Sequence, residues 1–113
     1  MIKIYHNPRC TKSRQGLALL EALSLSFKVI PYLKDPITAI ELKEMIAILD
    51  IEPIELVRKN ETIWKEQFKE KNLSDEEIIE AMIEYPKLIE RPIVINKNKG
   101  VVGRPAELIK SIL

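Results

Sequence analysis

The first third of the chain has the order strand, loop, helix, strand, and this order limits its fold more than any other feature. Residues 2–5 alternate Ile, Lys, Ile and Tyr before a polar loop that begins at His6. Apolar residues recur at helical spacing from Ser13 to Leu25, and Phe27 to Leu33 is a second run typical of a strand. The sequence therefore predicts a βαβ unit, with a parallel strand pair and a right-handed crossover.

The middle of the chain has helical patterns. Two capping-box signatures stand in front of apolar residues at helical spacing, and two weaker helical patterns lie between them. The signatures are Thr38 with Glu41 and Ser74 with Glu77, and the weaker patterns are 52–58 and 60–71. We expect three or four helices in an insertion at about residues 38–89.

The end of the chain returns to strands. Residues 93–96 are apolar and mostly β-branched, 97–100 have turn composition, and 101–103 can pair back as the second strand of a hairpin. A short helix is expected from Pro105, as its first residue. The order βαβ, helices, ββα is that of an α/β thioredoxin-like domain with an all-helical insertion between strands 2 and 3. We expect residues 1–113 to form one such domain.

Composition excludes several classes of protein. Eighteen basic and 17 acidic residues give a net charge of +1, so no global basic field indicates nucleic-acid binding. The start MIKIYHNP lacks a signal-peptide pattern, and no run of apolar residues is long enough to span a membrane. The single cysteine excludes an intramolecular disulfide and favours a reducing, cytoplasmic location. An oxidised Cys10 would therefore need an external reductant.

The loop HNPRCTKSR has the chemistry of a reactive thiol site. Cys10 follows a strand and precedes a helix, so the first free N–H groups of that helix would face its sulfur. These N–H groups belong to Thr11, Lys12 and Ser13, while Arg9, Lys12 and Arg14 add positive charge. The arrangement predicts a lowered thiol pKa, and the same N–H donors would hold a tetrahedral oxyanion against the sulfur.

Other interpretations of this loop are open. A lone cysteine is often a small buried apolar residue, although the polar and basic neighbours of Cys10 are unlike a core. Ser13 stands where a dithiol motif would have its second cysteine, which excludes a dithiol cycle. His6 is either a general acid or base in a supporting role, or a loop residue bonded to the backbone. One Cys and one His are too few for a zinc site, so no metal is expected.

Four motifs together resemble the glutathione- and glutaredoxin-coupled arsenate reductases. They are HNPRCTKSR, LVRKN at 56–60, ERPIV at 90–94 and GRP at 103–105. The resemblance implies that Arg58, Arg91 and Arg104 stabilise the bound oxyanion, as planar guanidinium groups do well. It also implies a cis peptide bond between Arg91 and Pro92, which would place Pro92 in a supporting role beside the thiolate.

The resemblance implies a reaction as well. The Cys10 thiolate would attack arsenate, glutathione would release arsenite, and glutaredoxin would resolve the mixed disulfide, with no bound cofactor. Arg9, Thr11 and Lys12 differ from the small residues of well-characterised arsenate reductases, and the chain ends at Leu113 without the longer tail of those enzymes, which resembles a shorter branch of the family. The alternatives are a glutathione-dependent thiol reductase of another substrate and an Spx-type regulator that binds RNA polymerase. The arginine set and the serine at position 13 favour the enzyme.

Overall fold

The computed structural model describes residues 1–113, which form two compact units. The sheet unit consists of Met1–Asp35 and Arg91–Leu113, and the helical unit is Pro36–Glu90. The two units are described separately below.

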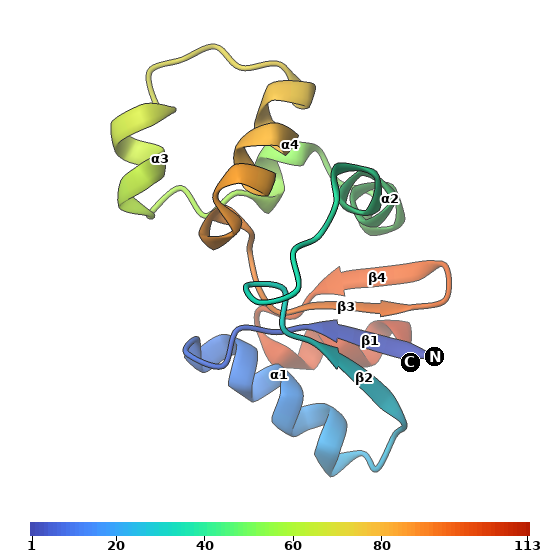
Figure 1. The fold of residues 1–113 in the computed structure, drawn as a ribbon. Coiled ribbons are helices and arrows are strands. Elements are labelled where there is room, and N and C mark those ends of the chain that lie inside the picture. Colours follow the sequence, from blue (N-terminus) through green and yellow to red (C-terminus); the bar gives the residue numbers. More distant parts are fainter. The chain divides into compact units, whose positions relative to one another are not determined.

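The sheet unit has four strands in the order β2-β1-β3-β4 (Figure 1). Its elements are β1 (Ile2–Tyr5), α1 (Thr11–Ala22), β2 (Phe27–Ile30), β3 (Ile93–Asn96), β4 (Lys99–Val102) and the 3₁₀ helix η3 (Ala106–Ile112). Strand β1 pairs in parallel with β2 and antiparallel with β3, so that Ile4 lies between Val29 and Val94. This confirms the predicted βαβ unit and C-terminal hairpin, and it supplies the strand order that periodicity left undetermined.

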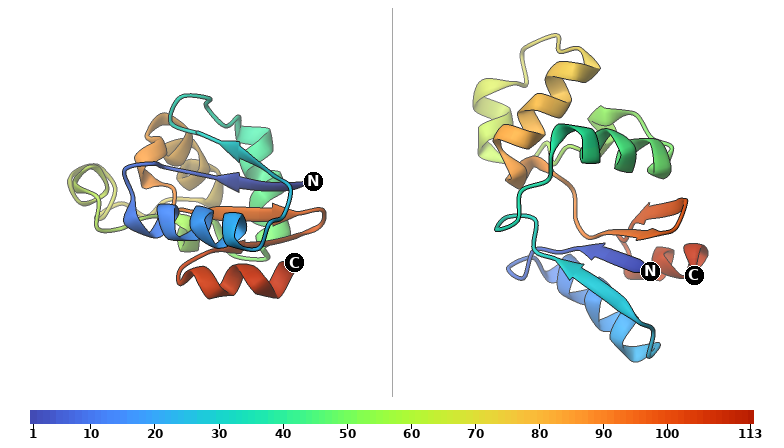
Figure 2. Two further views of the ribbon diagram at one scale, coloured as in Figure 1. Left: turned by 90° about the horizontal axis from the view of Figure 1, so that it is seen from below. Right: turned by 45° about the vertical axis from the view of Figure 1, so that its right-hand side comes forward.

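One face of the sheet is covered by α1 and η3, which lie side by side (Figure 2, left). The buried cluster beneath them is made of apolar residues from both helices and the two central strands. Its members are Ile4, Leu20, Val94, Ile109 and Ile112. The strands that support the Cys10 loop are therefore anchored by residues from both ends of the sequence.

Two predicted boundaries near the cysteine were wrong. Strand β2 ends at Ile30 instead of Leu33, because Pro31 begins a turn. The Pro31 carbonyl accepts hydrogen bonds from the N–H groups of Lys34 and Asp35 at 2.8 and 2.9 Å. Helix α1 is Thr11–Ala22 instead of 13–25 and begins directly after Cys10. The polar residues of its first turn hide this start from a periodicity argument.

Two boundaries near the C-terminus also differ. The hairpin turn has only two residues, because Asn96 pairs directly with Lys99. Lys97 has the left-handed φ of 59° that such tight turns require. Pro105 precedes η3 as its cap instead of being its first residue.

Gly16 lies where α1 packs against Pro92 in the loop before β3. A Cβ atom at this position would stand 2.7 Å from the Pro92 ring and 3.3 Å from Ile109 Cδ1. Alanine normally favours a helix over glycine by about 1 kcal/mol, but here the added methyl group meets a ring that cannot turn away. We expect Gly16→Ala to lower the free energy of unfolding by about 1–3 kcal/mol. Urea unfolding of Gly16→Ala measures this change, and Ala18→Gly at an exposed position of α1 is the control for helix preference alone. A Gly16→Ala protein that is more stable than the wild type would contradict the close contact.

The helical unit has three α-helices and two 3₁₀ turns. They are α2 (Ala39–Leu49), η1 (Pro53–Leu56), α3 (Thr62–Gln67), α4 (Asp75–Glu84) and η2 (Pro86–Leu88). Both predicted capping boxes are present, with Thr38 and Ser74 accepting from the N–H groups of Glu41 and Glu77 at 3.1 and 3.2 Å. Helix α4 packs against α2, η1 and η2. No helix in either unit has the length and apolar character needed to span a membrane.

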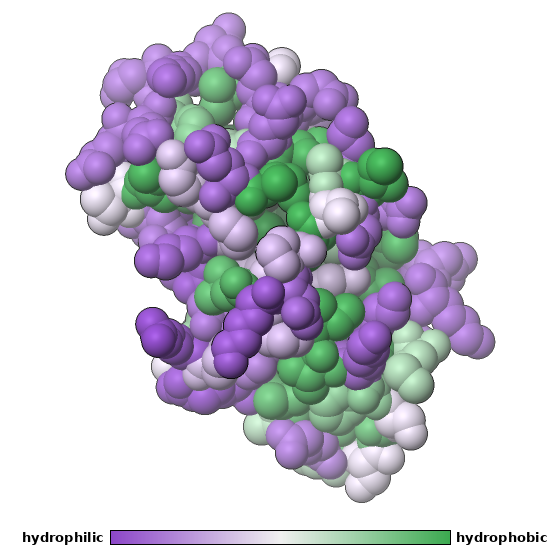
Figure 3. Space-filling view, in the orientation of Figure 1, coloured by the Kyte–Doolittle hydropathy of each residue, from purple (hydrophilic) through white to green (hydrophobic).

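Strand β2 forms one edge of the sheet, and its outer side is partly apolar. Leu25, Val29 and Leu33 are exposed around this strand, and apolar surface is visible in the lower part of Figure 3, over α1 and β2. The exposed Lys28 interrupts the apolar residues of the strand. A charge at such a position disfavours pairing with a second sheet edge.

Candidate active site

The loop between β1 and α1 is held by its own backbone. The His6 N–H donates to the Ile30 carbonyl at 2.9 Å, which continues the parallel pairing of β1 with β2 by one residue. The Asn7 carbonyl accepts from the Cys10 N–H at 3.0 Å, and the Asn7 side chain accepts from the Arg9 N–H at 3.0 Å. These bonds place Cys10 at the N-cap of α1. Our sequence analysis did not single out Asn7, although Asn is a common residue in turns of this kind.

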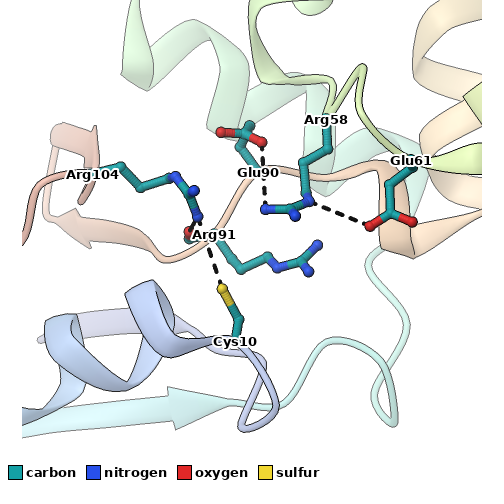
Figure 4. A network of polar contacts seen from close by, with 6 residues as sticks. All are labelled: Cys10, Arg58, Glu61, Glu90, Arg91 and Arg104. Carbon is teal, nitrogen blue, oxygen red and sulfur yellow. Dashed lines mark hydrogen bonds and ion pairs between the residues drawn. The ribbon is translucent and has the colours of Figure 1, made fainter.

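The Cys10 thiol is partly exposed and lies beside two arginines that are distant in sequence. Arg104 Nη1 lies 3.9 Å from Cys10 Sγ and donates to the Arg91 carbonyl at 3.1 Å. The Arg91 side chain is buried, and its guanidinium is close enough to act on the thiol (Figure 4). The structure therefore excludes the interpretation of Cys10 as a core residue.

The surroundings of Cys10 favour its thiolate form. Partial burial by itself would raise the pKa of the thiol. This effect is outweighed by the Ser13 backbone N–H, the Arg91 side chain and the Lys12 backbone N–H, so the pKa of Cys10 lies below its ordinary value. The donors are two of the three helix N–H groups that the sequence predicted, together with one arginine that only the fold brings near.

His6 and Ser13 form a buried pair behind the loop. His6 Nδ1 lies 2.7 Å from Ser13 Oγ, which also accepts from the Asn7 N–H at 3.0 Å. Burial lowers the pKa of His6, with a further decrease from the Arg14 charge, although a hydrogen bond with Ser13 opposes both. The His6 side chain is thus bonded to the Ser13 hydroxyl in the first turn of α1. A supporting role of His6 as a general acid or base stays a prediction.

The remaining residues of the loop differ in what they contact. Arg14 donates to the Pro8 carbonyl at 2.9 Å and to Thr11 Oγ1 at 3.2 Å, so its guanidinium links the middle of the loop to the first residue of α1. Arg9 and Lys12 are exposed. Of the three basic side chains, only that of Arg14 is hydrogen-bonded in the loop.

Arg58 belongs to the helical unit. Its N–H donates to the Leu88 carbonyl at 2.7 Å, and its guanidinium pairs with Glu61 at 3.5 Å and Glu90 at 3.8 Å (Figure 4). The two carboxylates fix the orientation of the guanidinium. The action of Arg58 on an oxyanion at Cys10 stays a prediction.

The peptide bond between Arg91 and Pro92 is cis, as the resemblance implied. The bond between Arg104 and Pro105 is also cis, which we did not predict. Each of the two arginines beside Cys10 therefore directly precedes a cis proline.

The lowered thiol pKa predicts a specific pH profile for alkylation. Only the thiolate reacts, so the rate of iodoacetamide addition should rise with pH and level off once Cys10 is ionised. We expect the midpoint below the value of about 8.5 for a free cysteine. The measurement is the pseudo-first-order alkylation rate against pH, with N-acetylcysteine as the reference thiol. A midpoint equal to that of the reference would contradict an activated Cys10.

A comparison with known proteins identifies the family. The sequence profile of the ArsC family matches residues 5–112. The chain belongs to the ArsC family. It is 39% identical to an arsenate reductase of Neisseria meningitidis, covering 99% of this chain and 97% of the relative. It is 36% identical to an arsenate reductase of Escherichia coli, covering 99% of this chain and 80% of that relative.

The fold of this ArsC-family protein matches a solved structure of the same family. An arsenate reductase from Vibrio cholerae superposes with a TM-score of 0.95 at 42% identity, covering 99% of this chain and 97% of that one. The predicted family, the α/β thioredoxin-like fold and the assignment to an enzyme of arsenate reductase type are confirmed. No three His, Cys, Asp or Glu side chains gather in a group that would hold a metal ion.

Proposed function

We propose that this ArsC-family protein reduces arsenate to arsenite in the cytoplasm, with Cys10 as the nucleophile and glutathione and glutaredoxin as the reductants. One observation supports this most directly. A partly exposed thiol with a lowered pKa stands at the N-cap of α1, beside Arg91 and Arg104. This is the combination of nucleophile and anion donors that attack on an oxyanion requires.

Arsenate would bind in front of the thiol. Its negative oxygens would accept from the backbone N–H groups of Thr11, Lys12 and Ser13, where the helix dipole also favours an anion. The guanidinium groups of Arg91 and Arg104 would neutralise charge that develops as the As–S bond forms. Arg58 would complete the set that the family resemblance implies.

The reaction is a two-electron reduction in two bond-forming steps. The Cys10 thiolate first attacks arsenic, and one oxygen leaves as water after protonation, which gives an arsenate thioester on sulfur. A glutathione thiolate then attacks the Cys10 sulfur, and the S–As bond breaks with its electron pair on arsenic. The products are arsenite, now As(III), and a Cys10–glutathione disulfide, so the two thiols supply both electrons.

The mixed disulfide must be opened by another molecule. The chain has one cysteine, so no second thiol of its own can resolve the bond. A glutaredoxin thiolate would attack the glutathione sulfur and release the Cys10 thiolate for another cycle. The proposal therefore requires both reductants for rapid multiple turnovers.

The test is arsenite formation by the purified wild-type protein. With arsenate, glutathione and glutaredoxin together, we expect continuous turnover, and omission of glutaredoxin should reduce this to slow turnover or a single burst. Arsenite is measured directly by chromatography with arsenic detection, with the protein omitted as the blank. A folded protein whose arsenite yield equals the blank would reject arsenate reduction.

A further inference from the structure

A groove of about 530 Å³ lies between α1 and the start of η3. Lys12 and Gln15 line it from the helix, and Pro105 and Glu107 line it from the other side. Its volume is within the roughly 300–1,000 Å³ of small-molecule sites. Our sequence analysis gave no function to Gln15 or Glu107.

Two residues that line the groove, Lys12 and Pro105, connect it to the surroundings of the Cys10 thiol. The Lys12 backbone N–H acts on the Cys10 thiol, and Pro105 directly follows Arg104, whose guanidinium lies 3.9 Å from the sulfur. Helices α1 and η3 begin at the same end of the sheet and run side by side (Figure 2, left). A molecule in the groove would therefore have one end beside Cys10 and would extend along α1 toward Leu19.

The groove offers one charge of each sign. Lys12 contributes an ammonium group from α1 and Glu107 a carboxylate from η3, and neither belongs to an ion pair of the structure. An α-amino-acid head group has a carboxylate and an ammonium on one carbon, so it complements this pair. Ala18 forms part of the wall and leaves room beside the charges.

We propose that the groove binds the γ-glutamyl head group of glutathione and so directs its sulfur toward Cys10. The carboxylate of the head group pairs with Lys12 and its ammonium pairs with Glu107. The cysteinyl residue, next in the tripeptide, then lies at the end of the groove beside the thiol. This inference rests on the proposed function because that function names glutathione as the reducing thiol. The groove adds the place where glutathione binds.

The test uses thiol–disulfide exchange without arsenate. The Cys10 thiolate attacks glutathione disulfide, its S–S bond breaks, a Cys10–glutathione disulfide forms and one glutathione thiolate leaves. Hydroxyethyl disulfide reacts in the same way but has no charged head group. Mass spectrometry of the modified protein gives the rate constant for each reagent, and their ratio measures recognition of glutathione.

We expect the ratio of the two rate constants for the wild type to be at least about tenfold that of N-acetylcysteine. Glu107→Gln should lower the ratio about fivefold, because one partner of an exposed charge pair is lost. Ala18→Trp should lower it about tenfold or more by filling the groove. Glu21→Gln removes an exposed carboxylate of α1 outside the groove and should preserve the ratio.

The charge of the reagent makes the outcome decisive. Glutathione disulfide is a net anion, so loss of any carboxylate should speed its reaction slightly through general electrostatics. A slower reaction of Glu107→Gln, with the hydroxyethyl disulfide rate preserved, would establish recognition in the groove. The proposal would be overturned if Glu107→Gln and Ala18→Trp both kept the ratio of the wild-type protein. It would also be overturned if the wild-type protein had the same ratio as N-acetylcysteine. Because arsenate is absent, a failure of arsenate reduction leaves this result unaffected.

Discussion

Cys10→Ser is expected to reduce arsenite formation by at least roughly 10³-fold while the protein stays folded. The serine hydroxyl is almost fully protonated at neutral pH and cannot form the disulfide that ends the proposed reaction. The thiol is not part of the buried core, and serine is a favoured helix N-cap residue, so stability should be maintained or slightly increased. Arsenite yield per enzyme and the urea midpoint together measure both effects.

A matched control separates chemistry from folding. Ser111 is exposed in η3, so Ser111→Ala changes one hydroxyl far along the chain from the thiol. This variant should keep wild-type turnover. Substantial arsenite formation by Cys10→Ser would show that another group attacks arsenate, and the proposed mechanism would then be wrong.

Arg91→Ala is expected to lower kcat/KM for arsenate by about 10²-fold, the usual effect of losing one donor to a developing anion. Two losses combine in this variant. A guanidinium that would bind the oxyanion is removed, and the pKa of Cys10 rises because the Arg91 side chain no longer favours the thiolate. The alkylation midpoint of Cys10 should therefore move to higher pH in the same variant.

Two further variants test the reason for the Arg91 effect. Arg91→Lys keeps the positive charge but loses the planar fork of donors. Compared with Arg91→Ala, it should restore the low alkylation midpoint of Cys10 more fully than it restores kcat/KM for arsenate. Lys28→Ala, which removes an exposed cation from β2, should change neither property. An Arg91→Ala protein with wild-type kcat/KM and an unchanged alkylation midpoint would show that Arg91 does not act on arsenate or on the Cys10 thiol.

Local sequence signals predicted much of the fold because they depend on contacts between near neighbours. The two capping boxes formed as expected, since Thr38 and Ser74 each need only a partner three residues away. The boundaries that failed were those where the apolar pattern and the backbone disagree. Strand β2 stops at the turn that Pro31 begins within an apolar run, and α1 starts in polar residues that carry no apolar spacing.

The position of Cys10 at the N-terminus of a helix was determined by the sequence itself. A thiol between a strand and a helix meets the first N–H groups of that helix, because helix geometry directs them outward at the N-terminus. The single cysteine likewise determined that no internal disulfide can form.

Only the tertiary structure decided which distant groups meet that thiol. Arg91 and Arg104 reach Cys10 because β3 and β4 pair into the same sheet as β1, and no local pattern specifies this approach. The same assembly requires glycine at position 16, where α1 passes against Pro92. Contacts between residues far apart in sequence depend on how the elements pack, and spacing along one element does not encode that packing.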